Sequence, residues 1–393
     1  MDSQLSSELN AIQDELVEIL HDIHSHPELS LKEERTSKLV AKKLKEYGLT
    51  VTEGVGQYGV IGTLKSNQSG NHSIGLRADM DALHLTEQTD LSYSSKIPEA
   101  MHACGHDGHT VMLLGAAKYL AEHRDSFCGT AHFIFQPAEE NLQGAYNMIK
   151  DKLFERFPVD AIYGLHNTTN MEVGKFGIRS GPMMAASDRW VVTFCGTGGH
   201  GGLQPHLATD ITVLQAQFIM ALQTIVSRNI ASTDSAVVSV GAIEGGSFDA
   251  LAVMPSKLRI GGTTRSFIKS VRDTVERRMK EITDGLAQTF GCTVEVEYCR
   301  SGIPLVNHVK ETMRAMNAAE SLVGKESVDG NMIPITAAED FAYMLEEKPG
   351  AYMMIGNGNK SGPIHSPTYV FNKENIPFGV GYWIKLVQQE LQN

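Results

Sequence analysis

The chain is poor in cysteine and has no long hydrophobic run. Its five cysteines are an odd number without a regular spacing, which excludes a disulfide scaffold and indicates a reducing compartment. No apolar run approaches the roughly 20 residues that span a bilayer, and the N-terminus lacks the basic flank and apolar core of a signal peptide. We therefore expect a cytoplasmic protein with no membrane partner.

Basic residues are also in deficit. The chain has 34 Lys and Arg residues against 46 Asp and Glu residues, a formal net charge of −12. No local run of basic residues offsets this excess of negative charge, so the sequence contains no stretch typical of binding to nucleic-acid phosphates. We therefore expect no nucleic-acid partner.

What is present is an alternation of short apolar runs with helical patterns. Apolar positions recur at three- and four-residue spacings over residues 5–47, interrupted at Pro27, and predict two amphipathic helices. From there to about residue 180, strands such as "GVIGTL" and "AHFIFQ" alternate with helices. This order is typical of an α/β layer with a largely parallel sheet, and it resumes near residue 300.

A different order occupies the middle of the chain. Between Asp188 and Cys299 the expected elements run β-α-β-β-α-β, which is the ferredoxin-like split unit. A chain of 393 residues is long enough for two separate cores. We predict an α/β domain made of residues 1–184 and 300–393, with a smaller domain of residues 185–299 inserted into it.

Residues 101–110, "MHACGHDGHT", gather three histidines, an aspartate and a cysteine. Other potential ligands follow apolar runs elsewhere: Asp79, Asp81, Glu139, Glu140, His166 and His365. Taken singly, each is as well explained as a helix cap, a surface carboxylate or a loop histidine. Because the carboxyl ends of parallel strands meet at one crevice, we expect five side chains to converge there. They are Cys104, His106, Glu140, His166 and His365.

These five side chains offer too many donors for one catalytic metal ion, which typically takes three protein ligands and keeps one position open. Two ions roughly 3.5 to 4 Å apart fit the number better. A thiolate, imidazoles and a carboxylate suit Zn, Mn, Co or Ni rather than Ca or Mg. We therefore predict two divalent metal ions per chain.

Glu139 and Glu140 are neighbours at a strand-to-loop transition, where successive side chains point in different directions. If Glu140 ligates a metal ion, Glu139 is free to act as general base and then general acid toward a metal-activated water. The simpler alternative is a pair of solvated carboxylates at the start of a helix.

Several motifs occur here in the order and spacing of one family. The stretches are "RADMDAL", "MHACGHDGHT", "FQPAEE", "GLHN", "GHGGLQPH", "GTTRSF", "EDF" and "HSPTYVFN". Over nearly the entire chain, the sequence resembles the M20 metallopeptidase family, in its branch of N-acyl-amino-acid amidohydrolases that includes hippurate hydrolases and plant auxin-conjugate hydrolases. The resemblance implies a dinuclear catalytic α/β domain, and an inserted lid domain through which two or more copies associate.

The resemblance also implies roles for individual residues of the catalytic domain. The five converging side chains match the family's metal ligands, and Glu139 matches its general base. Asp79 matches a carboxylate that orients a residue of the metal site. We expect His102, Asp107 and His109 to support the ligands, although Asp107 is equally well explained as a cap of the helix that follows.

Two residues of the inserted domain match family positions. His200 of "GHGG" resembles a histidine that stabilises the oxyanion in a neighbouring active site, and Arg265 of "TTRSF" resembles an arginine that holds a substrate carboxylate. On local sequence alone, a turn histidine and a strand-surface arginine explain them as well.

The sequence departs from the family pattern in two places. Ala252 stands where relatives usually have an asparagine that helps bind the substrate or oxyanion, with two apparent extra residues upstream. Asp249 is a candidate to replace that contact. His84 stands where relatives commonly have proline. We therefore expect an unusual substrate preference.

Together, these observations predict a metal-dependent hydrolase that cleaves the amide bond of a small N-acyl amino acid. Two alternatives stay open. One is a dipeptidase or an N-carbamoyl-amino-acid hydrolase on the same scaffold. The other is a catalytically impaired relative that binds a ligand without turnover.

Overall fold

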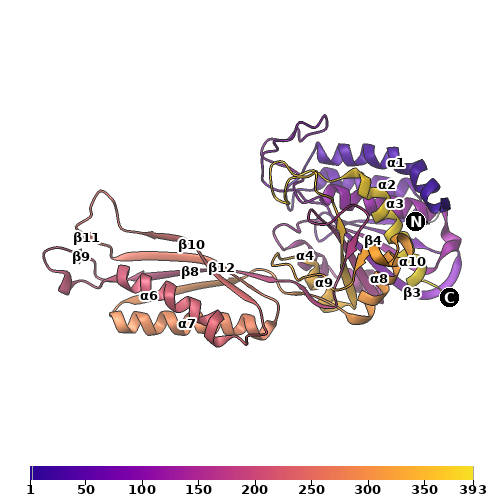
Figure 1. Cartoon of the computed structure of the whole chain (residues 1–393). Coiled ribbons are helices and arrows are strands. Elements are labelled where there is room, and N and C mark those ends of the chain that lie inside the picture. The colour runs from indigo at the N-terminus through magenta and orange to yellow at the C-terminus, as the bar shows by residue number, and fades with distance from the viewer. Residues whose placement is uncertain (2, 393) are drawn as a thin grey trace. The chain divides into compact units, whose positions relative to one another are not determined.

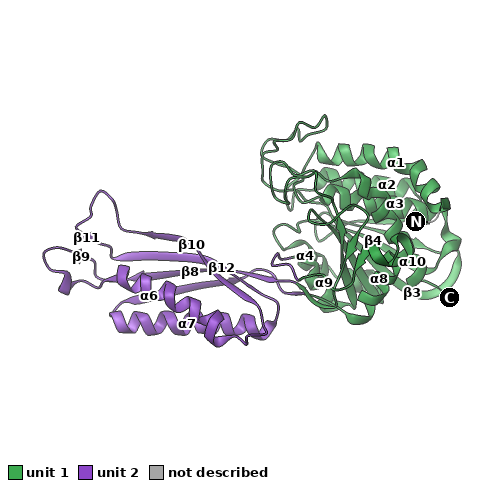
Figure 2. Ribbon diagram, in the orientation of Figure 1, with its two compact units in different colours: residues 1–183, 306–333, 339–393 green, residues 184–305, 334–338 purple. Residues whose placement is uncertain are grey.

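A computed structural model describes residues 1 and 3–392 of the chain. These residues form two compact units (Figure 2). Unit 1 consists of residues 1–183, 306–333 and 339–393, and unit 2 consists of residues 184–305 and 334–338.

Unit 1 is built on an eight-stranded mixed sheet (Figure 1). In spatial order its strands are β1 (Thr50–Val55), β2 (Gly59–Lys65), β4 (Cys128–Gln136), β3 (Gln68–Asp79), β5 (Ala161–Thr168), β16 (Gly350–Gly356), β6 (Phe176–Gly177) and β15 (Val328–Asp329). The central strands β4, β3, β5 and β16 run parallel, as predicted. The pairs β1–β2, β2–β4 and β16–β6 are antiparallel, so the parallel pattern holds for the centre of the sheet only.

Helices cover both faces of this sheet, and its central strands bury side chains on both sides, with Leu76 and Phe133 on one face and Arg77 and Ile162 on the other. One face shares a core with α1 (Ser3–His24), α2 (Glu34–Glu46), α3 (His106–Glu122), α8 (Val309–Val323) and α10 (Ile376–Glu390). The short helices α4 (Gly144–Lys150), α5 (Leu153–Arg156) and α9 (Phe341–Glu347) contribute to the rest of the unit, with α4 packed on β4 and α9 on β5.

The parallel arrangement decides where the motifs lie. Strands β3, β4, β5 and β16 all end at the same edge of the sheet, with Asp79 and Gln136 as the last residues of β3 and β4. The segments that follow these strands carry the histidines and carboxylates singled out in the sequence. Folding of the sheet therefore gathers them at one edge.

Unit 2 has the predicted β-α-β-β-α-β order. Its elements are β8 (Ala186–Cys195), α6 (Ile211–Thr224), β10 (Ala236–Gly245), β12 (Lys257–Ser266), α7 (Lys269–Phe290) and β13 (Thr293–Arg300). The strands form an antiparallel sheet in the order β10-β12-β8-β13, and its core includes Trp190, Phe194, Phe218 and Met279.

Two small sheets complete the strand pairing. β9 (Gly199–His200) pairs with β11 (Val253–Met254) in unit 2, and β7 (Gly181–Met184) pairs with β14 (Leu305–Asn307). Among the helices that the structure describes, none is both long and apolar enough to cross a membrane.

Candidate metal centre

The start of α3 places two of the predicted ligands. Gly105 precedes the helix with a φ of 91°, and a Cβ at this position would overlap the side chains of Asn167 and Tyr369. Glycine is therefore required here, and the turn that it makes holds Cys104 and His106 close to the ends of the parallel strands. Both side chains are buried.

His106 is oriented like a metal ligand. Its Nδ1 lies 3.0 Å from the backbone oxygen of Asp81, to which it donates, so the lone pair of the neutral ring is on Nε2. That Nε2 atom is buried and has no hydrogen-bond partner among the described residues. Its nearest charged neighbours are carboxylate oxygens of Asp79 at 3.7 Å and of Glu139 and Glu140 at 3.9 Å.

The two remaining histidines approach from other segments. His166, near the end of β5, donates from Nδ1 to the backbone oxygen of Asn167 at 2.7 Å, and its Nε2 lies 3.4 Å from the sulfur of Cys104. His365 lies in a loop after β16, with a φ of 65°, and its Nε2 lies 3.4 Å from Oε1 of Glu140. The structure therefore brings all five predicted ligands together.

The donor atoms fit a bound cation better than they fit one another. Oε1 of Glu140 is buried and lies 3.4 Å from Nε2 of His365 and 3.9 Å from Nε2 of His106. Burial raises the pKa of Cys104, which keeps the thiol neutral, and hydrogen bonds to Cys104 and Glu140 raise the pKa of His365 to about 10. A divalent cation stabilises a thiolate and takes neutral imidazoles as ligands, and so reverses both effects.

Two groups of donors overlap at His106. Ligand atoms of Cys104, His106 and Glu140 lie within 4.8 Å of one another, as do those of Asp79, His106, His109 and His166. His109 already has partners on both ring nitrogens: Nδ1 is 2.6 Å from Asp79, and Nε2 accepts from the backbone of Asn167 at 3.0 Å. His109 therefore contacts Asp79 and Asn167, and its predicted support of the metal ligands stays a prediction.

Asp79 is held as an anion at the end of β3. Although burial alone would raise its pKa, interactions with His106, Arg77 and His109 lower the pKa of Asp79 well below the usual range. Arg77 donates to Oδ2 of Asp79 at 2.7 Å. The carboxylate of Asp79 is thus oriented on both oxygens and lies next to the candidate ligand His106.

Glu139 lies among other carboxylates. Its carboxyl oxygen lies within 4.8 Å of those of Glu339 and Asp340. Burial, and then repulsion from Glu339, Glu140 and Asp340, raise the pKa of Glu139 well above its usual value. This environment favours proton uptake by Glu139, which is the property that a general base and acid needs.

Arg77, Glu339 and Asp340 were not assigned a role from the sequence. Arg77 is completely buried and donates to Glu339 at 2.8 Å and to Asp340 at 3.3 Å. Tyr352 also donates to Glu339. The only signal in the sequence was that Arg77 belongs to "RADMD" and that the two acidic residues belong to "EDF".

Asp81 orients two of the predicted ligands. The sequence indicated it only as a possible metal ligand. Its Oδ1 lies 3.2 Å from Nδ1 of His106, and its Oδ2 accepts from the backbone N–H of Glu140 at 3.0 Å and from Ser30 at 2.6 Å. Both carboxylate oxygens are therefore committed to holding the site.

The other polar residues around α3 are buried as well. Asp107 lies 2.7 Å from Nδ1 of His24 on α1 and does not cap α3, since the N-cap position is Gly105. His102 is buried, neither of its ring nitrogens has a hydrogen bond to a residue that the structure describes, and burial lowers its pKa to about 4. Asp107 thus links α3 to α1.

The two candidates of unit 2 are organised locally. His200 is exposed, and its Nδ1 accepts from the backbone N–H groups of Gly202 and Leu203 at 3.1 and 3.0 Å. The neutral ring must therefore carry its proton on Nε2, which is the donor that an oxyanion needs. Arg265 is partly buried and donates from Nε to the backbone oxygen of Thr336 at 3.1 Å.

Ala252 lies next to His200, because β9 and β11 pair His200 with Val253. The backbone oxygen of Ala252 accepts from the N–H of Gly201 at 2.8 Å. Ala252 therefore supports the β9 turn through its backbone, and its methyl side chain supplies none of the polar contacts expected of an asparagine.

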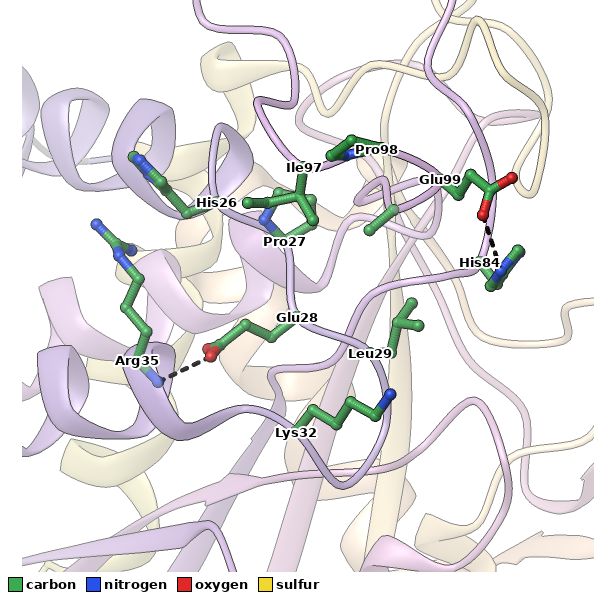
Figure 3. A pocket seen from close by; sticks show the side chains of 11 residues that line it. His26, Pro27, Glu28, Leu29, Lys32, Arg35, His84, Ile97, Pro98 and Glu99 are labelled. Carbon is green, nitrogen blue, oxygen red and sulfur yellow. Dashed lines mark hydrogen bonds and ion pairs between the residues drawn. The ribbon is translucent and has the colours of Figure 1, made fainter.

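A separate hollow of unit 1 has a volume of about 520 Å³ (Figure 3). None of the five predicted ligands lines it, but His84 does. Its charged groups are largely paired: Arg35 lies 2.7 Å from Asp22, and His84 lies 3.7 Å from Glu99. A bridge between Leu29 and Ala82 connects its wall to the segment that contains Asp81.

The chain is similar to known enzymes and to solved structures over nearly its whole length. The chain is 40% identical over 388 residues to the hippurate hydrolase of Campylobacter jejuni, covering 99% of this chain and 100% of that protein. It is 38% identical over 368 residues to the N-acetyl-L-cysteine deacetylase of Bacillus subtilis, covering 94% and 86%. The solved structure of the Bacillus subtilis YXEP protein, a dinuclear metal binding peptidase of family M20, superposes with a TM-score of 0.83 at 31% identity, covering 96% and 98%. The model of peptidase family M20/M25/M40 matches residues 75–389, and the chain belongs to this family.

Proposed function

We propose that this protein is a metal-dependent hydrolase of the amide bond in small N-acyl amino acids. The observation that carries the proposal is that five donor side chains from four segments of the chain lie together, and that Nε2 of His106 among them is buried with no hydrogen-bond partner in the described residues. The names of the two similar enzymes, a hippurate hydrolase and an N-acetyl-L-cysteine deacetylase, support this substrate class.

Two divalent ions would be held by Cys104, His106, Glu140, His166 and His365. When bound, they supply Lewis acidity that polarises the amide carbonyl and makes water more acidic. The mixed thiolate, imidazole and carboxylate set supports Zn, Mn, Co or Ni as the ion.

Glu139 would move the protons of the reaction. Its carboxylate accepts a proton from the attacking water and then delivers it to the leaving amine, which balances the hydrolysis. Glu339 and Asp340 favour the protonated form of Glu139 after the first transfer, because their charges lie close to its carboxyl group. Asp79 would keep the neighbouring imidazoles oriented.

Unit 2 would contribute to substrate binding. An N-acyl amino acid has a free carboxylate, which an arginine binds with two parallel hydrogen bonds, and we assign this role to Arg265. We assign oxyanion stabilisation to Nε2–H of His200. The local hydrogen bonds to Nδ1 of His200 support this assignment, since they orient the ring and select the required tautomer.

We also propose that two copies associate through unit 2, which would make the protein a homodimer. β10 is an edge strand of the unit 2 sheet, so one side of it has no partner strand among the described residues. Val213, Met220, Val237 and Ile243, on α6 and β10, are exposed apolar side chains. An unpaired edge beside apolar residues is typical of a surface that pairs with another chain. The cytoplasmic location stays a prediction.

A substrate panel tests the function. Acetyl, benzoyl, carbamoyl and aminoacyl amides of several amino acids are assayed with protein reconstituted with Mn, Zn or Co. We expect hydrolysis of the acetyl or benzoyl amides. Preference for aminoacyl or carbamoyl amides would establish a dipeptidase or an N-carbamoyl hydrolase instead. Failure to retain any metal would indicate a binding protein without turnover.

A further inference from the structure

A second pocket of unit 1 lies at the opposite edge of the sheet from the metal centre. Its volume is about 670 Å³, and Thr63 and Lys65 of β2, Ser73 of β3, and Thr130 and His132 of β4 line it. Thr130 precedes the last residue of β4 by six residues, which corresponds to about 20 Å of extended strand. The pocket is therefore separate from the metal centre.

Strand register builds the floor of this pocket. Thr50 pairs with Thr63, and Thr63 pairs with His132, so these three residues form a row across β1, β2 and β4. Lys65 and Thr130 form the next row. Because residues two apart on a strand share a face, both rows project to the same side and present hydroxyls, an imidazole and an ammonium group together.

The positive charges of the pocket are poorly neutralised. Lys65 has no hydrogen bond or ion pair with any residue that the structure describes. Arg124 donates only to backbone oxygens, of Gly48 at 2.8 Å and of Ala121 at 3.3 Å. Two carboxylates adjoin the pocket without lining it: Asp151 lies 2.9 Å from Arg156, and Asp160 lies 3.4 Å from the lining residue His72. Neither is paired with Lys65 or Arg124 in the part of the chain that the structure describes.

No Asp or Glu is among the described residues that line this pocket, although the chain carries a net charge of −12. The hollow in Figure 3 differs, since Glu28 and Glu99 are among the residues that line it. Burial and the charge of Lys65 lower the pKa of His132 to about 4, so that its ring is neutral and accepts or donates hydrogen bonds without adding charge. A local excess of cations beside hydroxyl groups suits a multiply charged anion.

We propose that this pocket binds a small molecule that carries two or more phosphate groups. Its volume lies within the roughly 300–1,000 Å³ of typical small-molecule sites. Lys65 and Arg124 provide the charge, and Thr63 and Thr130 provide hydroxyl donors. The basic residues of this pocket come from segments that are distant in the sequence. No run of basic residues in the sequence therefore predicts the site.

Calorimetric titration of the metal-reconstituted full chain tests the proposal. The probes are ADP, inorganic pyrophosphate and adenosine. Binding of ADP and pyrophosphate without binding of adenosine identifies the phosphates as the recognised group. Binding of ADP alone assigns the site to nucleotides, because the base then contributes as well. Binding of adenosine equal to that of ADP would overturn the proposal.

Substitutions locate the binding. Lys65→Ala and Arg124→Ala should each weaken ADP or pyrophosphate binding about tenfold, since each removes a charge-assisted contact. Lys96→Ala, which removes another exposed lysine outside the pocket, should leave binding unchanged. All three variants should keep wild-type amide hydrolysis. Lys65→Ala and Lys96→Ala should also keep the wild-type melting temperature, whereas Arg124→Ala loses its hydrogen bonds to Gly48 and Ala121 and is checked for folding by circular dichroism.

Phosphates also bind metal ions, so a phosphate probe could bind at the metal centre instead of in this pocket. The same titrations distinguish the two sites. Binding that survives in Lys65→Ala and Arg124→Ala but is displaced by an N-acyl amino acid would place the anion at the metal centre and overturn the proposal. Absence of binding by both phosphate probes at millimolar concentration would also overturn it. Neither result affects the assignment of the hydrolase activity, which the substrate panel tests separately.

Discussion

The metal centre of unit 1 and the candidate residues of unit 2 differ in how they are held. In unit 1, His106, Asp79 and Asp81 are buried and are oriented by hydrogen bonds from several segments. In unit 2, His200 is exposed, and its ring is oriented by the backbone N–H groups of Gly202 and Leu203 in the same turn.

This difference teaches which function each unit can perform by itself. The buried candidate ligands of unit 1 are oriented by hydrogen bonds within this unit, so we expect the unit to bind metal ions by itself. An exposed imidazole is surrounded by water and stabilises an anion weakly until another surface excludes that water. We therefore expect substitutions in unit 1 to affect metal binding or the proton transfer, and those in unit 2 to affect turnover only.

The largest effect should come from Glu139→Gln. The amide cannot accept the proton of water, so kcat should fall about a thousandfold or more. Glu139 is not one of the proposed ligands, so metal content measured by mass spectrometry should stay at the wild-type value. Glu53→Gln, which changes an exposed carboxylate on β1, serves as the control. Turnover of the Glu139 variant near the wild-type rate would exclude Glu139 as the base.

The next largest effect is a loss of stability at high pH, caused by the buried, charged His24 of unit 1. Burial alone would lower the pKa of His24, but its hydrogen bonds to Asp107 and Glu87 raise the pKa to about 9. A folded-state pKa above the ordinary 6.5 means that the stabilisation is complete below about pH 6.5 and is lost as pH rises through 9. It amounts to about 3 kcal/mol.

The free energy of unfolding in urea, measured from pH 6 to pH 10, tests whether the stability falls as pH rises. The wild-type protein should lose about 3 kcal/mol more than His24→Gln over this range. His84→Gln, at an exposed histidine, is the control and should follow the wild type. Parallel curves for the wild type and His24→Gln would show that His24 is not charged in the folded state.

A smaller effect is expected from His200→Ala in unit 2. Loss of one oxyanion donor should lower kcat about a hundredfold. The metal content and the melting temperature should not change, because the side chain is exposed. His206→Ala, at another exposed histidine of unit 2, is the matched control. If His200→Ala lost metal instead, the proposed division of roles between the two units would be wrong.

The smallest effect should come from Asp81→Asn. An amide keeps the shape of the side chain but loses the charge that orients His106, so metal affinity should fall about tenfold. Competition with a fluorescent chelator measures this affinity. Asp90→Asn changes an exposed aspartate and should leave the affinity unchanged. Equal affinities for the two variants would show that the site does not depend on this support.

Much of the fold could be predicted because each main element has its own apolar period. The two helices of residues 5–47, the strands of the central sheet and the order of elements in unit 2 are confirmed. Helix bounds are harder to predict. The apolar spacing predicts one helix over about residues 206–229, but α6 begins at Ile211, because Asp210 caps it by accepting from Thr212 and Val213. The apolar spacing also predicts a helix from about Thr110, whereas α3 begins at His106. The first turn of α3 consists mostly of buried polar side chains, which give no apolar period from which to predict it.

The edges of the sheet could not be predicted in the same way. Strands as short as β6 and β15 have only two residues each and carry no period. The antiparallel direction of β2 relative to β4 depends on the connection between them and on packing of the whole unit. Neither is encoded in a local pattern.

The site likewise has parts that the sequence predicts and parts that it does not. Ligand types at strand ends suggested which side chains meet, and the structure brings them together. The support by Arg77 could not be read from the sequence, since its partner Glu339 lies 262 positions away and a buried arginine looks like any other in a sequence. The basic pocket around Lys65 was equally hidden, because its charges come from β2, the segment after α3, and α5.

The central claim is that five side chains of unit 1 hold two metal ions. A crystal structure of the chain grown with Mn or Zn, with anomalous diffraction collected at the absorption edge of the metal, tests it most directly. We predict two anomalous peaks per chain, roughly 3.5 to 4 Å apart, contacting Cys104, His106, Glu140, His166 and His365. A single peak, or peaks that do not contact these side chains, would contradict the account.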